Sequence, residues 1–402
     1  MSIVRPARRT LIAAGLGVLA AGAAAPTAFA APAPSAPAAT APAPTPLRLD
    51  GPTGPERVGA VQLHLVDPAR KDPWTGSGKP RELMATLHYP AHGTRGHAML
   101  PWLSEGTARA LKERYPGKLD GHAMPLTHSA DAAPAARHGR RRPVLLYSPG
   151  FGSDRSFNTL VVEDLVSWGY IVVTVDHPHD SGEVEFPDGH VQTRTVFGAN
   201  KEEVTKAVGV RAEDLRFVLD CLAVLDRGGN PDAERRRLPH GLRGTLDLGR
   251  VGAFGHSLGG ASSAALMHQD RRVRAGIDLD GTLYGPVVTA GLDRPFLLMD
   301  TADHDGLKKD PAWTEFWKHL GGWHRCLRLA DAQHLSFTDI VALAPQMKGG
   351  FPQVGTIPAD RAVAAVRATV RAFFELHLRG RADAGHLLEG ASRRYPEVGF
   401  IA

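Results

Sequence analysis

The stretch Gly255-His256-Ser257-Leu258-Gly259-Gly260 decides the fold of this chain. It follows the short apolar run 250–254, which predicts a buried strand, and it precedes the small residues 261–267, which predict a helix packed close to a sheet. A serine between glycines at a sharp strand-to-helix turn is typical of a nucleophile elbow, because the small neighbours let strand and helix approach and leave the hydroxyl exposed. The sequence therefore predicts a serine nucleophile at position 257.

The order of the other elements predicts an α/β-hydrolase fold. Strands are expected at 144–147 and 170–175 before the elbow, and at 275–277, 295–299 and 326–329 after it. Helical periodicity at 201–225 and 360–378 supplies covering helices, so the main strands should be parallel. Roughly alternating apolar residues at 61–65 and 83–89 predict antiparallel strands that extend the same sheet. We expect a mostly parallel central sheet with helices on both faces.

The N-terminus predicts export and a flexible tether. Three arginines precede an apolar run that ends in Ala28-Phe29-Ala30, so residues 1–30 are expected to be a secretory signal peptide cut after Ala30. Residues 31–46, nearly all Ala, Pro, Ser and Thr, predict a linker that cannot bury enough apolar surface to fold. Residues 47–402 are long enough for one catalytic domain, and the protein is expected to be secreted.

The net charge indicates which classes of binding partner to expect, and the cysteine content shows whether a disulfide is possible. The net charge of +5 includes three signal arginines, which leaves about +2 for the mature chain, and nucleic acid is not an expected partner. The basic run 137–142 is interpreted as a solvated loop in preference to a membrane contact. Cys221 and Cys326 could pair in a secreted protein, but two buried thiols are an equally good interpretation.

A serine hydroxyl needs a base within hydrogen-bond distance and a third group to orient that base. His334 directly follows the last of the strands expected in the parallel sheet, where such a base is expected. Two acids are candidates: Asp280, at the end of the strand after the elbow, and Asp305, after the next strand. The chain order Ser, acid, His is satisfied by either carboxylate.

At these residues the chain resembles the plasma-type platelet-activating factor acetylhydrolase family. The resemblance rests on the elbow, on Gly276-Ile277-Asp278-Leu279-Asp280, and on His334 followed by Phe337 and Asp339, and it covers about 143–339. It implies that Ser257 is the nucleophile, Asp280 the orienting acid and His334 the base. It further implies that the backbone N–H groups of Phe151 and Leu258 form the oxyanion hole.

The chain departs from that family at two places. Pro149 stands where the family usually has histidine, and residues 281–286 differ from the family's aromatic stretch, which bears on the acyl preference. The elbow also resembles that of secreted lipases and polyester hydrolases. Those enzymes usually have methionine in place of Leu258 and take their acid after the later strand, which would favour Asp305.

Several other side chains fit either a structural or a functional role. The face formed by Trp313, Phe316, Trp317 and Leu320 is expected to pack on the sheet in preference to a transient contact with a lipid interface. The polar run 176–180 is expected to line the mouth of the site, with a metal site as the alternative. His256 is expected to pack beneath the elbow, and Arg211 and Asp214 to form a pair on a helix surface.

We therefore expect a serine carboxylester hydrolase that acts through an acyl-enzyme on a small-molecule or lipid ester and needs no cofactor. The resemblance implies phospholipids with short or oxidised sn-2 acyl chains. The alternatives are a lipase or cutinase-like polyester hydrolase and, in another class, a non-catalytic lipid- or cell-wall-binding member of the fold.

Overall fold

The computed structural model describes residues 44–137 and 141–402. The expected signal peptide, most of the expected linker and the middle of the basic run lie outside these ranges. The last residues of the expected linker are paired: strand β1 (Thr45–Pro46) lies parallel to β5 (His122–Ala123). Thr45 and Pro46 therefore belong to the folded unit, although they lie before the expected domain boundary at residue 47.

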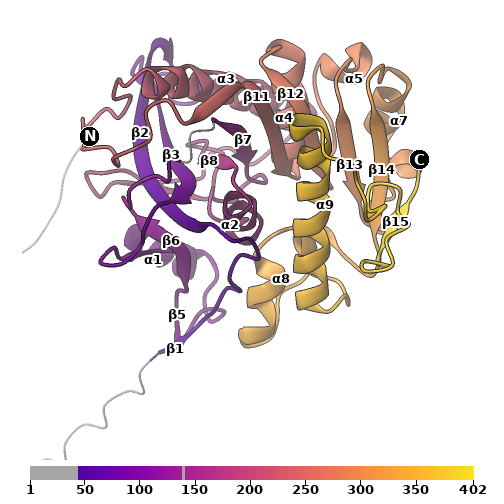
Figure 1. Ribbon diagram of the computed structural model, residues 1–402, viewed down its shortest axis with the longest axis horizontal. Coiled ribbons are helices and arrows are strands. Elements are labelled where there is room, and N and C mark those ends of the chain that lie inside the picture. Colours follow the sequence, from indigo (N-terminus) through magenta and orange to yellow (C-terminus); the bar gives the residue numbers. More distant parts are fainter. Residues whose placement is uncertain (1–43, 138–140) are drawn as a thin grey trace, which may run out of the picture. The chain divides into compact units, whose positions relative to one another are not determined.

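An 11-stranded mixed sheet forms the centre of the folded unit (Figure 1). The strands from β14 to β8 run parallel, whereas β3 pairs antiparallel with both β8 and β2, as the sequence predicts. In spatial order the strands are β15 (Val398–Phe400), β14 (His324–Leu329), β13 (Phe296–Asp300), β12 (Val273–Leu279), β11 (Leu246–His256), β7 (Arg142–Ser148), β8 (Ile171–Val175), β3 (Pro80–Ala91), β2 (Arg57–Lys71), β6 (Leu126–Asp131) and β4 (Met99–Pro101).

Helices cover the sheet, and a small hairpin of β9 (Glu183–Glu185) and β10 (Val191–Thr193) stands apart from it. The helices expected at 201–225 and 360–378 are confirmed as α3 and α9. The helical segments are α1 (Glu105–Arg114), α2 (Thr159–Ser167), α3 (Lys201–Asp226), α4 (Leu258–Gln269), α5 (Val287–Ala290), α6 (Gly306–Lys309), α7 (Pro311–Lys318), α8 (Ile340–Leu343), α9 (Ala359–Arg379) and the 3₁₀ turns η1 (His334–Phe337) and η2 (Ala344–Gln346).

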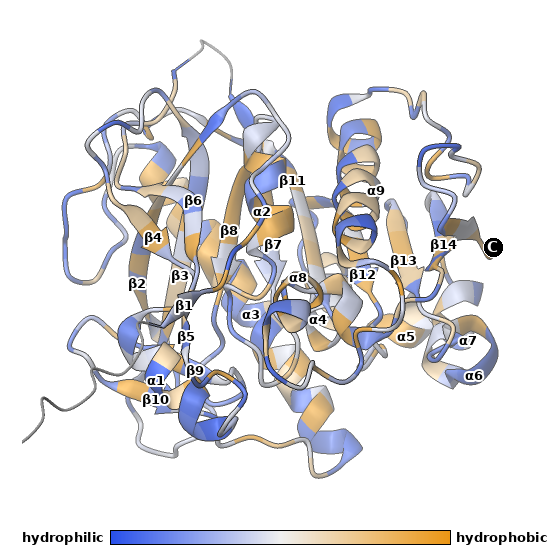
Figure 2. Ribbon diagram, turned by 90° about the horizontal axis from the view of Figure 1, so that it is seen from below, coloured by the Kyte–Doolittle hydropathy of each residue, from blue (hydrophilic) through white to orange (hydrophobic). Residues whose placement is uncertain are grey.

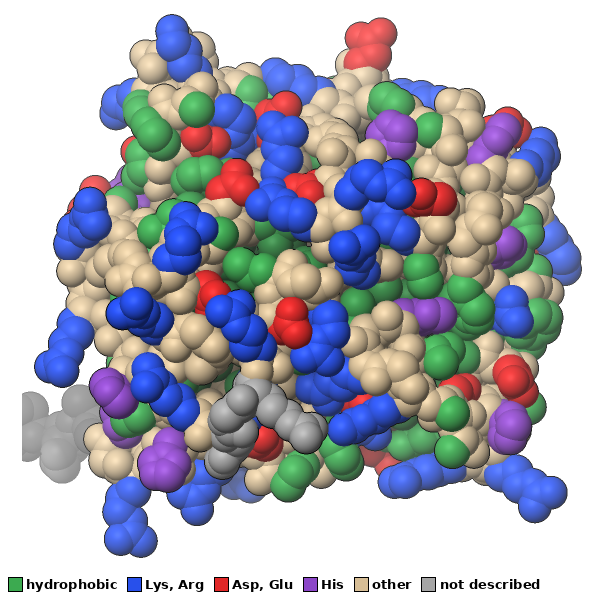
Figure 3. All heavy atoms as spheres, turned by 45° about the horizontal axis from the view of Figure 1, so that its top comes forward, with side chains coloured by type: hydrophobic (Ala, Val, Ile, Leu, Met, Phe, Trp, Pro, Cys, Tyr) green, Lys and Arg blue, Asp and Glu red, His purple; other side chains and the backbone are tan. Residues whose placement is uncertain are grey.

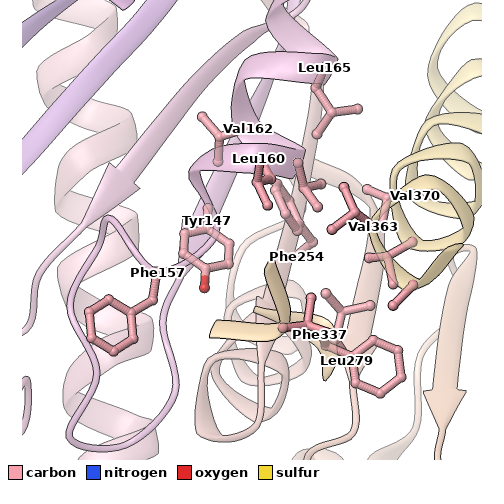
Figure 4. Close-up of a cluster of buried hydrophobic side chains, with 14 of the residues drawn as sticks. Tyr147, Phe157, Leu160, Val162, Leu165, Phe254, Leu279, Phe337, Val363 and Val370 are labelled. Carbon is pink, nitrogen blue, oxygen red and sulfur yellow. The ribbon is translucent and has the colours of Figure 1, made fainter. Parts of the chain in front are cut away.

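Alternation along the strands builds two hydrophobic cores. Successive side chains of a strand point to opposite faces, so Leu145 and Tyr147 of β7 join α2 and α9, whereas Val144 and Leu146 join α3 and α4. Figure 4 shows the first of these cores, with Phe254 among side chains of α2 and α9. Figure 2 shows hydrophobic residues concentrated on the strands of the sheet and a mixture of hydrophobic and hydrophilic residues along α9. The α/β-hydrolase fold is confirmed.

The aromatic face of α7 packs inward, as expected. Trp313 and Phe316 are fully buried in the core that α3 and α4 share, and Phe316 meets Phe296 of the sheet edge to face. Trp317 is half-buried and its ring meets His324 edge to face. In the described part of the chain, no helix is long and apolar enough to cross a membrane.

The interpretation of Arg211 and Asp214 as a pair on a helix surface is wrong. Both side chains are completely buried on the inner side of α3, and each pairs with a different partner: Arg211 with Asp180, and Asp214 with Arg81. A buried charge must be paired and hydrogen-bonded, so these residues belong to a network inside the protein. They stand on the same helical stripe as the apolar residues that hold α3 to the sheet.

Both cysteines carry free thiols. Cys221 on α3 and Cys326 on β14 are buried, and burial raises the pKa of the Cys221 thiol to about 12. On the face in Figure 3, Lys and Arg side chains are interspersed with Asp and Glu. At the end of the basic run, Arg142 Nη2 lies 3.0 Å from Glu56 Oε1.

Candidate active site

The elbow holds Ser257 in a strained backbone conformation. The residue lies between β11 and α4 with φ 54° and ψ −126°, values that residues other than glycine rarely adopt. A Cβ at Gly255 would lie 2.2 Å from the carbonyl carbon of Gly259, and a Cβ at Gly259 would lie 1.9 Å from the carbonyl oxygen of Ser148. Only glycine fits at either position, so the sequence motif is a direct consequence of the tight turn.

The end of the neighbouring strand is fastened to the elbow. The Ser257 N–H donates to the Leu279 carbonyl at 2.8 Å, and Asp280, the next residue, donates its own N–H to Met299 at 2.8 Å. Asp280 has φ 61°, so the chain turns sharply where the carboxylate leaves the sheet. The carboxyl ends of parallel strands meet at one edge of a sheet, which brings the serine and this acid to the same place.

The structure places Asp280 beside His334. The His334 Nδ1–H donates to Asp280 Oδ2 at 2.6 Å, and Thr301 holds the other carboxylate oxygen through its N–H and its hydroxyl, both at 3.1 Å. Asp305, the alternative acid, instead accepts from Arg328 at 2.5 Å. Of the two candidate acids, Asp280 is the one hydrogen-bonded to the imidazole.

His256 supports the loop that carries His334, in the place beneath the elbow where it was expected. It is buried, its ring centre lies 4.5 Å from that of His334, and its Nε2–H donates to the His334 carbonyl at 2.9 Å. Burial, reinforced by the charge of His334, lowers the pKa of His256 to about 3, so this ring stays neutral. The position of the His334 backbone is therefore fixed from below.

A second histidine, which the sequence reasoning missed, lies on the other side of the acid. His304 Nδ1 is 3.3 Å from Asp280 Oδ1 and 3.4 Å from Asp300 Oδ1, and its Nε2 is 3.3 Å from Asp310 Oδ2. Burial lowers the pKa of His304, but hydrogen bonds to Asp280 and Asp310 and the nearby negative charges outweigh it and raise the pKa to about 10. His304 is thus a cation at neutral pH.

This cation affects the acid in turn. Burial raises the pKa of Asp280, but hydrogen bonds from His304 and His334 and their charges outweigh it, and the pKa is lowered to about 2. Asp280 is therefore ionised at neutral pH, the state in which it can orient an imidazole and stabilise an imidazolium. The run Asp303-His304-Asp305 gave no motif from which this role could be foreseen.

Replacing His304 with glutamine should remove a pH-dependent part of the stability. The folded-state pKa is raised above the ordinary value of 6.5, so the stabilisation is complete below about pH 6.5 and is lost as the pH rises towards 10. We expect the difference in free energy of unfolding between parent and His304→Gln to shrink over this range, measured by urea titration at several pH values. His319→Gln, on the surface of the molecule, is the control. A difference that does not change with pH would contradict the assignment.

The residues expected to supply the two oxyanion donors line the same cavity as the serine. Leu258 is the first residue of α4, so its N–H has no acceptor within the helix. Phe151 lies in the loop after β7, and within the described ranges its N–H has no hydrogen-bond partner. Phe151, Ser257 and Leu258 all line one cavity. Two free N–H groups beside a nucleophile are the arrangement that stabilises an oxyanion.

Two cavities meet at Ser257 and His334. The first, of about 450 Å³, has a mixed polar lining that includes Thr282, Tyr284 and Asp303. The second, of about 330 Å³, is more enclosed and more apolar. Its apolar lining includes Leu111, Trp102, Phe157, Leu335, Ile340, Leu343, Met347 and Phe351. An ester carbonyl at the serine could therefore place its two substituents in chemically different surroundings.

Residues 176–180 do not line the mouth of these cavities, contrary to expectation. Asp176, His177 and Asp180 are completely buried and bond to protein groups, and they form no metal cluster in the described part of the chain. Asp280, Asp300 and His304 do bring possible ligand atoms within 4.8 Å of one another. Because Asp280 also accepts from His334, and His304 also contacts a third carboxylate, we interpret this group as an ion cluster.

The elbow, the Asp280–His334 pair and the sheet that carries them define an α/β-hydrolase, and the names of its relatives identify the chain as a serine ester hydrolase. The chain belongs to the family described as platelet-activating factor acetylhydrolase, isoform II, whose model matches residues 122–386. The resemblance inferred from the motifs is confirmed.

Individual relatives agree on ester hydrolysis and differ in substrate. A probable 1-alkyl-2-acetylglycerophosphocholine esterase of Arthroderma benhamiae is 30% identical, with 89% of this chain and 95% of that protein covered. The platelet-activating factor acetylhydrolase of Gallus gallus is 22% identical, with 84% and 85% covered. The solved structure of a ferulic acid esterase from Streptomyces cinnamoneus is 36% identical with a TM-score of 0.74, covering 89% of this chain and 99% of that one.

Proposed function

We propose that this chain hydrolyses carboxylic esters through an acyl-enzyme formed on Ser257. The observation that carries the proposal is the 2.6 Å hydrogen bond from His334 to a carboxylate at the strand end next to the elbow. In this mechanism His334 takes the proton of Ser257 while the alkoxide attacks the ester carbonyl, and Asp280 stabilises the resulting imidazolium. The N–H groups of Phe151 and Leu258 hold the oxyanion, the alcohol leaves, and water releases the acid by the same route.

Two substrate classes are supported by different observations. Family membership supports phospholipids with a short or oxidised sn-2 acyl chain, the class to which the names of the Arthroderma and Gallus relatives point. The ferulic acid esterase supports esters of an aromatic acid. The enclosed cavity favours the second class, because its roughly 330 Å³ is lined mainly by apolar and aromatic side chains and an acetyl group is too small to fill it.

The two classes are separated by an assay panel of 1-alkyl-2-acetylglycerophosphocholine, methyl ferulate and p-nitrophenyl esters from acetate to palmitate. We expect methyl ferulate to have the higher kcat/KM of the first two, because an aryl-propenoyl group fills the apolar cavity and acetyl leaves it empty. Ser257→Ala gives the background rate. A higher kcat/KM for the phospholipid would favour the first class, and an optimum at palmitate would favour a lipase. Turnover that survives Ser257→Ala would contradict the proposal.

We also propose that the protein is exported and cleaved after Ala30. The support is the N-terminal sequence alone, with basic residues before an apolar run and small residues at the cleavage site. Mass spectrometry of protein recovered from the culture medium should find Ala31 as the first residue. An intact N-terminus on protein retained inside the cells would contradict the proposal.

A further inference from the structure

The loop that carries the Phe151 N–H is held from behind by a buried arginine. Arg211, on α3, is completely buried. Its Nη1 donates to the Pro149 carbonyl and its Nη2 to the Gly150 carbonyl, the latter at 3.2 Å. These carbonyls belong to the two peptide groups that directly precede Phe151.

The geometry of the peptide group links the hydrogen bonds of Arg211 to the oxyanion hole. The Gly150 carbonyl and the Phe151 N–H belong to one peptide group, and in a trans peptide these two groups point in opposite directions. No peptide bond in the described ranges is cis. Because Arg211 draws the carbonyl to itself, the N–H is turned away from α3. Gly150, Phe151 and Ser257 line one cavity, so the peptide group that Arg211 holds borders the space in front of the nucleophile.

Arg211 is in turn fixed by a second set of contacts. Its Nε donates to Asp180 at 2.9 Å and its Nη1 to the Ser148 hydroxyl at 3.3 Å. The backbone of Asp180 accepts from the Gly152 N–H at 2.9 Å, so the same residue holds the arginine and the far end of the loop. The loop 149–152 is therefore clamped at both ends by one buried ion pair.

Behind the arginine lies a hydrogen-bonded series with the bonds of a catalytic triad. Ser148 and His177 are joined at 3.0 Å, and His177 donates to Asp214 at 2.9 Å. Burial lowers the pKa of His177, so its Nε2 is free to accept from the serine. All three side chains are completely buried, so no substrate reaches them. The series serves to orient the Ser148 hydroxyl at the start of the loop.

Stability alone does not account for this arrangement. A buried ion pair contributes little more than well-packed apolar side chains of the same size, whereas its directed hydrogen bonds fix the positions of their acceptors. The acceptors here are the carbonyls before Phe151. We propose that Arg211 is a positioning residue that sets the direction of the Phe151 N–H in the oxyanion hole, an inference that rests on the proposed esterase function.

The test compares Arg211→Lys with the parent enzyme. Lysine keeps the charge, but its three N–H donors lie on one nitrogen and cannot reproduce the planar fork that bonds to two carbonyls, a hydroxyl and a carboxylate. We expect kcat on p-nitrophenyl acetate to fall by about 100-fold with KM changed by less than about 3-fold, because loss of one oxyanion donor lowers kcat by about 10² to 10³. We also expect the preference for an ester over its thionoester to fall by about 10-fold. Sulfur is the weaker acceptor, so this ratio reports the oxyanion hole itself.

Arg367→Lys is the matched control. Arg367, on α9, is also buried and also holds backbone carbonyls, those of Leu160, Gly51 and Asp50, but it does not touch the loop. Its replacement should leave kcat and the thionoester ratio within about 3-fold of the parent values, because a small change in packing away from the loop should not move the reacting groups. Asp180→Asn, which is isosteric, repeats the test if Arg211→Lys does not fold. It should reduce kcat by about 10-fold.

The outcomes separate this inference from the proposed function. A folded Arg211→Lys or Asp180→Asn enzyme with unchanged kcat and an unchanged thionoester ratio would overturn the positioning role. A fall in kcat with no change in that ratio would do the same, because it would locate the damage elsewhere. If the parent itself shows no Ser257-dependent hydrolysis, it is the esterase proposal that fails.

Discussion

Asp280→Asn is expected to lower kcat by about 10⁴-fold, whereas Asp305→Asn should leave it within about 3-fold. Asparagine has nearly the same shape, but its amide can present an N–H where the carboxylate accepts from His334 Nδ1. The imidazole then adopts the wrong tautomer and cannot take the serine proton. Within the described ranges, Asp305 accepts from Arg328 and the imidazole bonds to Asp280 instead, so the loss of the Asp305 carboxylate should affect local stability only.

Steady-state kinetics on p-nitrophenyl butyrate measure both variants, and circular dichroism establishes that each is folded. The effect should lie in kcat, since the acid acts on the chemical step and lines only the polar cavity. The reverse ranking, with Asp305→Asn inactive, would place this protein with the lipases that take their acid after the later strand.

Gly259→Ala should be among the most destabilising single methyl additions in the chain. The added Cβ would lie 1.9 Å from the Ser148 oxygen and 2.6 Å from the Ser148 carbon. Both are backbone atoms, so no side chain can rotate away and either β7 or α4 must move. We expect a loss of at least about 4 kcal/mol in the free energy of unfolding, the range reached only by severe overpacking or a comparable defect.

Gly209→Ala is the matched control for this prediction. Gly209 lies within α3, and a Cβ there would meet nothing within 4 Å. Alanine should therefore stabilise the protein by about 0.5–1 kcal/mol through helix propensity. Differential scanning calorimetry compares the two variants with the parent. A Gly259→Ala protein with an unchanged melting temperature would show that the contact between α4 and β7 is looser than described.

The fold, the elbow and the place of the histidine after the last parallel strand could be predicted because they depend on local signals. The elbow needs glycine at fixed spacing around Ser257, and chain order restricts the base to the loop after β14. The choice between Asp280 and Asp305 stayed open in the residues themselves, because both follow strands of the same sheet. The resemblance favoured Asp280, and the structure decides the contact through the bond to His334.

Arg211 shows what pattern reading missed and why. Val208, Arg211 and Leu215 follow one another at helical spacing, and the stripe continues to Leu225, so the arginine lies on the apolar face of α3. That spacing was available as a signal. The pairing with Asp214 at i+3 looked like a surface pair, because sequence separation alone cannot tell which partners tertiary structure supplies. His304 had no such signal, since Asp300 and Asp310 lie within six residues of it without forming a known motif and the contact with Asp280 comes from another strand.

The strained backbone at Ser257 sets stability and activity against each other in this protein. Its φ of 54° with ψ of −126° lies in a region that glycine occupies freely, and holding another residue there costs about 1–3 kcal/mol. Selection for thermal robustness alone would place glycine at the elbow, and the reactive hydroxyl would be lost with the strain. The rest of the fold, above all the two hydrophobic cores on either face of β11, must therefore contribute enough free energy of folding to offset the strain at Ser257.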